Sequence, residues 1–172
     1  MHRAPRIEEL NARMDSPETA THVPVREIMQ RDVRTTTPDR PIADVAQLLI
    51  DLDLTGMPVV DASGALVGVV TEYDIVSKRG ATVGDIMSRG VVSVTEETSA
   101  ARVVELVGLH GIRGIPVLRD GALVGLITRA DLVKLYLAQR WRCSACGHEE
   151  RGVSAPRTCA SCGGTGFQLI RE

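Results

Sequence analysis

Residues 68–74 read Gly-Val-Val-Thr-Glu-Tyr-Asp, and residues 125–131 read Gly-Leu-Ile-Thr-Arg-Ala-Asp. In both stretches a short apolar run passes into a threonine, and an aspartate follows three residues later. This spacing is typical of a helix N-terminus, because each side chain can satisfy a backbone N–H group of the first turn. Each stretch therefore predicts a strand that leads directly into a helix.

The two stretches are the ends of longer repeats. Three further motifs recur in the same order, and one single-residue deletion aligns the two copies from end to end. The recurring motifs are Val-x-x-Ile-Met at 25–29 and 83–87, Gly-x-Pro-Val at 56–59 and 114–117, and Gly-Ala-Leu-Val-Gly at 64–68 and 121–125. A solenoid needs about three or more copies. We therefore expect the two repeats to pack face to face with pseudo-two-fold symmetry.

Both copies predict the order strand, helix, strand, strand, helix. The first copy predicts strands at 33–36, 57–60 and 66–70, a helix around 42–52 and a helix opening at Thr71. The second predicts strands at 91–94, 115–118 and 123–127, a helix around 100–107 that ends at Gly111, and a helix from Thr128 that runs towards Trp141. Residues 1–20 are expected either to form one helical turn or to be disordered.

The composition excludes several classes of protein. Of the 172 residues, 44% are hydrophobic and 24% are charged, as in globular domains, and the net charge is −2. With this charge and only four aromatic residues, a nucleic-acid surface is not expected. The chain has no apolar run of the length of about 18 residues that a membrane span needs. The first residues lack the apolar core of a signal peptide, so the expected location is the cytoplasm.

Residues 25–76 and 83–133 each resemble a CBS domain in the three motifs Val-x-x-Ile-Met, Gly-x-Pro-Val and Gly-x-x-Thr-x-x-Asp. The pair resembles a Bateman module, and the resemblance covers about two thirds of the chain. It implies an α+β fold with two β-α-β-β-α repeats, packed sheet to sheet, and two clefts between them. It also implies binding of an adenosyl ligand such as AMP, ADP, ATP or S-adenosylmethionine, a homodimer, and a regulatory role.

The resemblance assigns residues to the first cleft. Asp74 would bind the ribose hydroxyls, because a carboxylate can accept from both hydroxyls of a diol, and Thr71 would lie beside it. The opposite repeat would supply the remaining contacts: Val91, Val92, Ile112 and Ile115 for adenine and Arg113 for phosphate. The alternative is that Arg113 is a solvated surface residue and that the apolar residues belong to the core.

The same reasoning assigns a second, unequal cleft. Asp131 and Thr128 would stand opposite a set supplied by the first repeat, namely Val33, Arg34, Leu54, Thr55 and Met57. Arg129 would supply the phosphate charge there, whereas acidic Glu72 takes that place in the first cleft. The two clefts are therefore not expected to be equivalent. A solvated Arg129 and a core Met57 are the alternatives.

All four cysteines lie in the tail, as Cys143-x-x-Cys146-Gly and Cys159-x-x-Cys162-Gly. Paired knuckles of this kind are similar to a zinc ribbon or a rubredoxin-like site, and four thiolates suit Zn²⁺ or a single iron ion. Disulfides or free thiols are the alternative, although disulfides are rare in the cytosol. Zinc can contribute about 10–16 kcal/mol to folding of such a segment, which has few apolar residues.

The predicted organisation is an N-terminal segment at 1–20, CBS repeats at 21–80 and 81–139, and a zinc-ribbon-like tail at 140–172. We expect a regulatory sensor of an adenosyl ligand. The alternatives are an iron redox protein that uses the four cysteines, and a nucleic-acid or protein-binding accessory that uses the tail. No catalytic constellation is evident, so the chain is not expected to be an enzyme. A protein partner remains unidentified.

Overall fold

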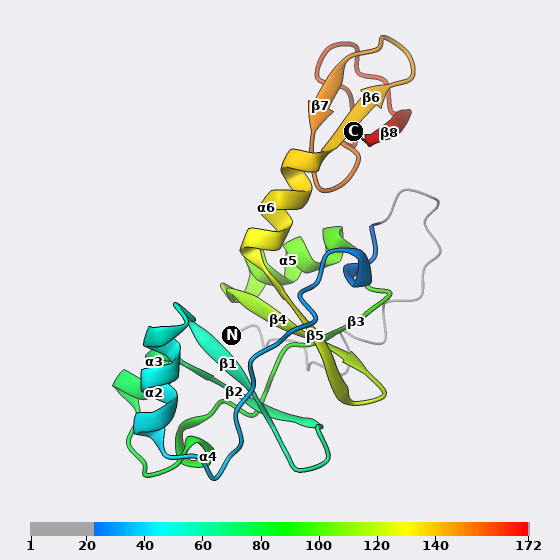
Figure 1. The fold of residues 1–172 in the computed structure, drawn as a ribbon. Helices are drawn as coiled ribbons and strands as arrows, with labels where there is room; N and C mark the ends of the chain where they lie inside the picture. The colour runs from blue at the N-terminus through cyan, green and yellow to red at the C-terminus, as the bar shows by residue number, and fades with distance from the viewer. Residues whose placement is uncertain (1–22, 172) are drawn as a thin grey trace, which may run out of the picture.

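The two repeats form matching α+β units side by side, and a small ribbon of strands extends from the second unit (Figure 1). This is the predicted fold class. The structure, a computed structural model, describes residues 23–171, so the prediction for residues 1–20 lies outside the described residues. Among residues 23–171, no helix has the length and apolar character needed to cross a bilayer.

The first repeat is built on an antiparallel pair of strands. It contains a 3-10 turn η1 (Val25–Glu27), helix α2 (Ile42–Asp51), strands β1 (Gly56–Val60) and β2 (Leu66–Thr71), and helix α3 (Glu72–Ser77). Helix α2 buries Val45 and Leu49, which lie four residues apart on one face. The apolar spacing thus directs this helix against the sheet.

The second repeat has the same order and one additional short strand. It contains α4 (Val83–Ile86), β3 (Val94–Thr95), α5 (Ala100–His110), β4 (Gly114–Arg119), β5 (Ala122–Thr128) and α6 (Arg129–Ala138), and its sheet order is β3-β4-β5. Helix α5 ends at Gly111, whose φ of 64° is the left-handed conformation that favours glycine. The predicted helix stop at Gly111 is confirmed.

The first predicted strand of each repeat is wrong in extent. Residues 33–36 contribute only an isolated bridge between Thr36 and Val59, and 91–94 is reduced to a two-residue strand at Val94 and Thr95. At Thr36 the chain makes two backbone bonds to β1, after which Pro38 follows. Pro38 lacks an N–H group and stops the ladder from continuing past Thr36, and residues 33–35 and 91–93 pair with none of the described strands.

The opening segment of each repeat packs into the other repeat. Val25 and Met29 belong to the core around β4 and α5, whereas Val83 and Met87 belong to the core around β1 and α2. The backbone of the opening segment also crosses to the other repeat, because Gln30 pairs with Leu126 in an isolated β-bridge. Each hydrophobic core therefore contains residues of both repeats, and neither core is complete without the other copy.

Two glycines make this exchange sterically possible. A Cβ atom added at Gly125 would lie 2.5 Å from the Met29 sulfur, and one at Gly68 would lie 2.7 Å from the Met87 sulfur. These glycines are the first residues of the repeated stretches 68–74 and 125–131. Their bare backbones let the methionine of the opposite repeat lie directly against the sheet.

Residues 139–171, called the ribbon below, follow α6 without a linker. The strands β6 (Gln139–Cys143), β7 (Glu149–Arg151) and β8 (Phe167–Arg171) form an antiparallel sheet in the order β7-β6-β8. The predicted last helix is present from Arg129 through Leu132, Leu135 and Tyr136, but it ends at Ala138, three residues before Trp141. Trp141 is instead fully buried in the ribbon, where its indole N–H donates to the Gly152 carbonyl at 2.9 Å.

The ribbon also contacts the second repeat. Val153 packs against the core of that repeat, and the Arg151 guanidinium donates to the carbonyl of Leu137 in the last turn of α6. Buried Gln139 lies at the junction, where its amide donates to the carbonyls of Gly152 and Val153 in its favoured orientation. Residues 151–153, at the end of β7 and just after it, therefore hold the base of the ribbon against the end of the helix.

Candidate ligand cleft and candidate metal centre

The two Thr-x-x-Asp motifs form the predicted helix caps. In the first, one carboxylate oxygen of Asp74 accepts from the Thr71 amide at 2.9 Å and from the Thr71 hydroxyl at 2.6 Å, and the Asp74 amide donates to that hydroxyl. Thr128 and Asp131 make the same carboxylate contacts at 2.9 and 2.6 Å. Each cap uses one oxygen of a buried aspartate and leaves the other for a different partner.

The second oxygen of Asp74 faces Lys78 and Ser88. The Lys78 ammonium lies 2.7 Å away and the Ser88 hydroxyl 3.4 Å away. Burial raises the pKa of the Asp74 carboxyl, but the hydrogen bonds from Lys78 and Thr71 outweigh burial and leave that pKa below its ordinary value of 3.8. Asp74 is therefore an ionised acceptor at neutral pH.

A cavity of about 680 Å³ opens beside Asp74, between the two repeats. Of the residues assigned to the first cleft, those that line it are Thr71, Asp74, Val91, Val92, Ile112 and Arg113. Ile115 does not line it, because this side chain is fully buried in the core of the second repeat. Thr55 and Met57, which were assigned to the second cleft, line this cavity as well.

The symmetry of the lining explains why Thr55 and Met57, expected in the second cleft, lie in the cavity beside Asp74. The cavity includes four pairs of equivalent residues from the two repeats: Thr55 and Arg113, Gly56 and Gly114, Pro58 and Pro116, and Val69 and Leu126. These pairs lie on the two sides of the pseudo-two-fold axis, so the cavity crosses that axis. From the axis it extends to Asp74, while Asp131 is not among its lining residues.

Sequence reasoning missed several lining residues, among them Tyr73, Lys78, Ser88 and Gly90. Helical spacing could have found Lys78, because a residue four positions after Asp74 lies on the same face of a helix. No local signal indicates Ser88 or Gly90. They reach the cavity only because the segment that opens the second repeat packs onto the first.

The charges around the cavity are paired. Lys78 forms an ion pair with Asp74, and the Arg113 guanidinium lies 4.0 Å from the Glu72 carboxylate. The side chains of Arg113 and Glu72 are both mostly exposed, so their attraction is weak and easily exchanged. Arg113 is thus available to an anionic group that enters the cavity, although Glu72 competes for it.

The residues of the second cleft have other neighbours. The Gln30 amide donates to both oxygens of Asp131, at 3.0 and 3.3 Å, and Lys134 lies 3.5 Å from one of them. Arg129 donates to the carbonyls of Ile112 and Gly111 at 2.9 and 2.8 Å. In this structure Arg129 thus holds a segment that lines the first cavity. The first cavity is not lined by Val33, Arg34, Leu54 or Thr128.

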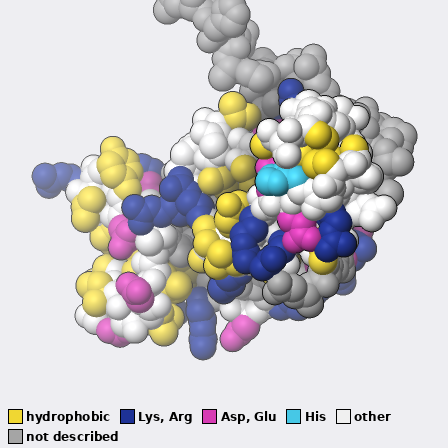
Figure 2. All heavy atoms as spheres, turned by 90° about the horizontal axis from the view of Figure 1, so that it is seen from above, with side chains coloured by type: hydrophobic (Ala, Val, Ile, Leu, Met, Phe, Trp, Pro, Cys, Tyr) yellow, Lys and Arg dark blue, Asp and Glu magenta, His cyan; other side chains and the backbone are white. Residues whose placement is uncertain are grey.

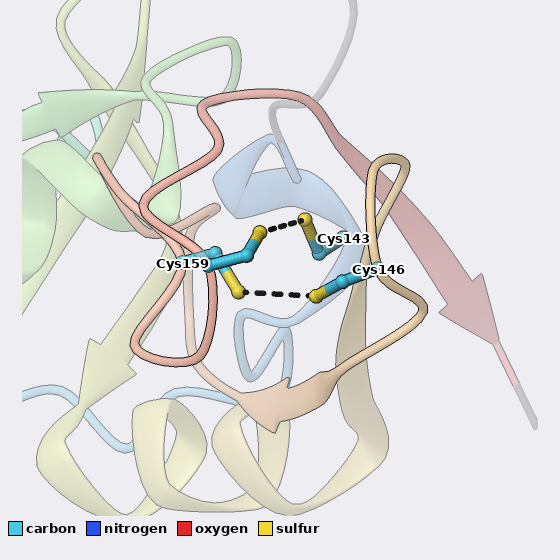
Figure 3. Close-up of side chains that lie close together, drawn as sticks. Cys143, Cys146 and Cys159 are labelled. Atoms are coloured by element: carbon cyan, nitrogen blue, oxygen red, sulfur yellow. Dashed lines mark hydrogen bonds between the residues drawn. The ribbon is translucent and has the colours of Figure 1, made fainter.

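The four cysteines meet in the ribbon, as Figure 3 shows for the facing thiols. All four sulfurs lie within 4.8 Å of one another, and Cys143 to Cys162 and Cys146 to Cys159 are each 3.7 Å apart. A disulfide would need about 2 Å. A tetrahedral ion with metal–sulfur bonds of about 2.3 Å needs sulfurs about 3.8 Å apart, so these residues fit a four-thiolate metal site.

Two matching turns aim the sulfurs inward. Gly147 and Gly163 have φ values of 76° and 72°, and their amides donate to the carbonyls of Cys143 and Cys159, each at 2.9 Å. A left-handed residue after each Cys-x-x-Cys lets the chain curl around the sulfurs, which explains glycine at both positions. Cys143 and Cys159 are buried, whereas Cys146 and Cys162 are exposed.

The thiols differ in acidity. Backbone N–H groups of Cys146 and Ala145 lower the pKa of Cys143 to about 7. At Cys162 the Gly164 N–H lowers the pKa, but the hydrogen bonds to the Cys146 and Cys143 thiols and burial raise it to about 12 overall. Cys143 therefore loses its proton more readily than Cys162, and the thiolate is the form of cysteine that binds a metal.

Comparison with known proteins identifies the repeats. The CBS domain family model matches residues 25–80 and 83–138. The chain belongs to the CBS domain family. The two matched segments are the repeats that pack around the cavity, and the ribbon lies outside both of them.

Relatives of known structure include CBS pairs with bound adenosyl compounds. CBSX2 of Arabidopsis thaliana in complex with AMP has a TM-score of 0.64 and 29% identity, and covers 66% of this chain and 96% of its own. The CBS domain pair of protein MJ0100, in complex with 5′-methylthioadenosine and S-adenosyl-L-methionine, has a TM-score of 0.62 and 28% identity, and covers 67% and 96%.

Curated relatives include enzymes. The chain is 35% identical over 108 residues to inosine-5′-monophosphate dehydrogenase of Thermoplasma acidophilum, which is 62% of this chain and 22% of that enzyme. The chain spans about a quarter or less of such relatives. The match therefore concerns a part of those proteins, and the absence of catalytic activity in this chain remains a prediction.

Proposed function

We propose that this chain is a regulatory sensor that binds an adenosyl ligand in the cavity between its CBS repeats. The observation that carries the proposal is a cavity of about 680 Å³ that is lined both by Asp74 and by apolar residues of the opposite repeat. An ionised carboxylate suits the two hydroxyls of a ribose, and Val91, Val92 and Ile112 offer an apolar slot for a base. Solved relatives with AMP and S-adenosyl-L-methionine support this ligand class.

Replacing Asp74 with Ala tests the site. The wild-type chain should gain thermal stability from AMP or from S-adenosylmethionine, by about 2.7 kcal/mol at a ligand concentration of 100 times Kd. Asp74→Ala should lose this gain while costing about 1 kcal/mol of stability for the lost helix cap. Asp44→Ala, at an exposed position of α2, is the matched control and should keep the gain.

The opposite pattern would reject the proposal. If Asp74→Ala lost several kcal/mol of stability and bound both compounds with unchanged affinity, Asp74 would be a structural cap only. Failure of AMP, ADP, ATP and S-adenosylmethionine to bind the wild-type chain would reject the adenosyl class itself.

For the ribbon we propose a structural zinc ion held by Cys143, Cys146, Cys159 and Cys162. When bound, the ion would hold the two Cys-x-x-Cys turns together and add folding free energy to the ribbon. The same donor set also suits a single iron ion. Native mass spectrometry would identify the metal, and a visible charge-transfer absorption that bleaches reversibly would favour the redox alternative.

A nucleic-acid role of the ribbon has less support. The Arg142 guanidinium donates to the Glu149 carboxylate at 2.8 and 2.6 Å, and Arg140 lies 3.8 Å from the same residue. Figure 2 shows basic and acidic side chains side by side on the face seen from above. Such pairs offset each other in the potential that would attract phosphates. Salt-dependent binding to DNA or RNA would contradict this view.

We further propose that the protein forms a homodimer. Large apolar side chains are exposed on the outer helices, with Ile50 75%, Val76 82% and Leu109 70% exposed. Exposed apolar patches of this kind mark protein interfaces, and a stable one buries about 1,000 Å² or more. Light scattering at tens of micromolar should give twice the chain mass, and a monomer mass would contradict the proposal.

A further inference from the structure

Two residues from equivalent positions reach the two buried aspartates, and they differ in length. Gln30 in the first repeat corresponds to Ser88 in the second, because the two lie 58 residues apart in the aligned copies. Gln30 bridges to Leu126 and Ser88 to Val69, which are also equivalent residues. The backbone thus presents both side chains in the same way to the aspartate of the opposite repeat.

The longer side chain bonds both oxygens of its aspartate, whereas the shorter one barely reaches Asp74. The close partner of Asp74 is Lys78, 2.7 Å away, which follows Asp74 in its own repeat and itself lines the cavity. The Gln30 amide donates to Asp131 at 3.0 and 3.3 Å, whereas the Ser88 hydroxyl is 3.4 Å from Asp74. Backbone bonds in both directions between Gln30 and Leu126, each 2.9 Å long, fix the base of the glutamine side chain. The donors of Gln30 therefore occupy the position at Asp131 that a ligand's hydroxyls would need.

Two neighbouring pairs of equivalent positions also have the smaller side chain on the Asp74 side. Gly90 and Val92 line the cavity on the Asp74 side, and a Cβ atom added at Gly90 would meet nothing within 4 Å. Their equivalents in the other repeat are Asp32 and Arg34, both larger and both charged. Three equivalent positions thus carry small residues beside Asp74 and large polar residues on the Asp131 side, where the first cavity does not extend.

We propose that each chain binds one adenosyl ligand, beside Asp74, and that the Gln30 side chain closes the equivalent position beside Asp131. This inference rests on the function proposed above and specifies the site and its stoichiometry. The Gln30 amide acts as an internal substitute for a ligand, because it supplies to Asp131 the hydrogen bonds that ribose hydroxyls would supply to Asp74.

The test counts ligands on the full chain by isothermal titration calorimetry with AMP and, separately, with S-adenosylmethionine. The wild-type chain should bind one molecule, and Gln30→Ser, which copies the serine of the open side, should bind two. Gln47→Ser is the matched control, because the Gln47 amide also donates to an aspartate, Asp51, but on the exposed face of α2. It should bind one.

Three further variants test the closure from the Asp74 side and in combination. Ser88→Gln should weaken binding beside Asp74 about tenfold or more, since a new donor to the carboxylate competes with the ligand. Asp74→Ala should bind none, and Asp74→Ala combined with Gln30→Ser should bind one again. Circular dichroism melts would verify that each variant is folded.

The outcomes separate the two proposals. Two molecules per wild-type chain, one per Gln30→Ser chain, or full affinity in Ser88→Gln would overturn the closure and leave the ligand-binding function intact. Binding of neither compound by the wild-type chain would overturn the function and the stoichiometry with it.

Discussion

The paired repeats and the ribbon are folded by different means. The two cores of the repeats bury large sets of aliphatic side chains drawn from both copies. In the described part of the ribbon the buried residues are Gln139, Trp141, Cys143 and Cys159, and two of these four are metal-ligand candidates. Burial of apolar surface is the main stabilising contribution in the repeats, whereas the described ribbon fully buries one large apolar side chain, Trp141, and is expected to depend on its cysteines.

This difference predicts two separate sources of stability in one chain. The repeats need each other, because their opening segments are exchanged. For the ribbon we have proposed a bound ion, and its described contacts with the second repeat include Arg151, Val153 and the end of α6. Ligand-dependent and metal-dependent behaviour should therefore be separable by experiment.

Metal removal should have the largest effect and should be confined to the ribbon. A chelator, or Cys159→Ser, removes a contribution of about 10–16 kcal/mol and should unfold residues near 142–171. Hydrogen exchange should then show lost protection in β6, β7 and β8 and retained protection in β1, β2, β4 and β5. Ligand binding should persist, because no residue of the ribbon lines the cavity.

Loss of hydrogen-exchange protection throughout residues 25–133 on metal removal would contradict the division into two independently stabilised regions. Ser144→Ala, at an exposed position between two of the cysteines, is a control that leaves all four thiols in place. It should keep the ribbon protected.

Truncation of an exchanged side chain should have the next largest effect. Met29→Ala should lower the free energy of unfolding by about 2–5 kcal/mol, because it leaves a cavity in the core of the opposite repeat. Denaturant unfolding should show one cooperative transition for both repeats, at a lower midpoint. Val133→Ala, at a side chain that is 58% exposed, should change stability by about 0.5 kcal/mol or less.

Separate transitions for the two repeats in Met29→Ala would indicate that the exchange does not couple them. A loss confined to β1 and β2 would likewise be incompatible with the core to which Met29 belongs.

Acid should have a smaller effect on the repeats than on the ribbon. The pKa of Asp74 is lower in the folded chain than its ordinary value of 3.8, so its ionised form stabilises the fold. That contribution is fully present above the unfolded pKa and is lost as pH falls through the folded pKa. The repeats should therefore show no change from Asp74 between neutral pH and about pH 5, and Asp74→Asn should flatten the loss below about pH 4.

The ribbon should be lost at higher pH than the repeats, since protons compete with the metal for the thiolates. Far-UV circular dichroism together with Trp141 fluorescence across the titration would compare the two regions, because Trp141 is the only tryptophan of the chain. Loss of the repeats before the tryptophan signal would reverse the proposed order.

Local patterns in the sequence determined much of this protein. The duplicated motifs, the two Thr-x-x-Asp caps, the Gly111 helix stop and the two Cys-x-x-Cys turns all depend on residues within a few positions of one another. The hydrogen bonds and conformational preferences that define these features therefore depend only on short stretches of sequence. The family resemblance and the α+β fold followed from the same motifs.

Only the tertiary structure decided how the repeats share their residues. The sequence did not indicate that Val25 and Met29 complete the opposite core, that Thr55 and Met57 lie with Asp74, or that α6 ends three residues before Trp141. The bond from Gln30 to Asp131 joins residues 101 positions apart. Such contacts depend on the way two folded units pack, and neither side-chain periodicity nor a motif of a few residues carries that information.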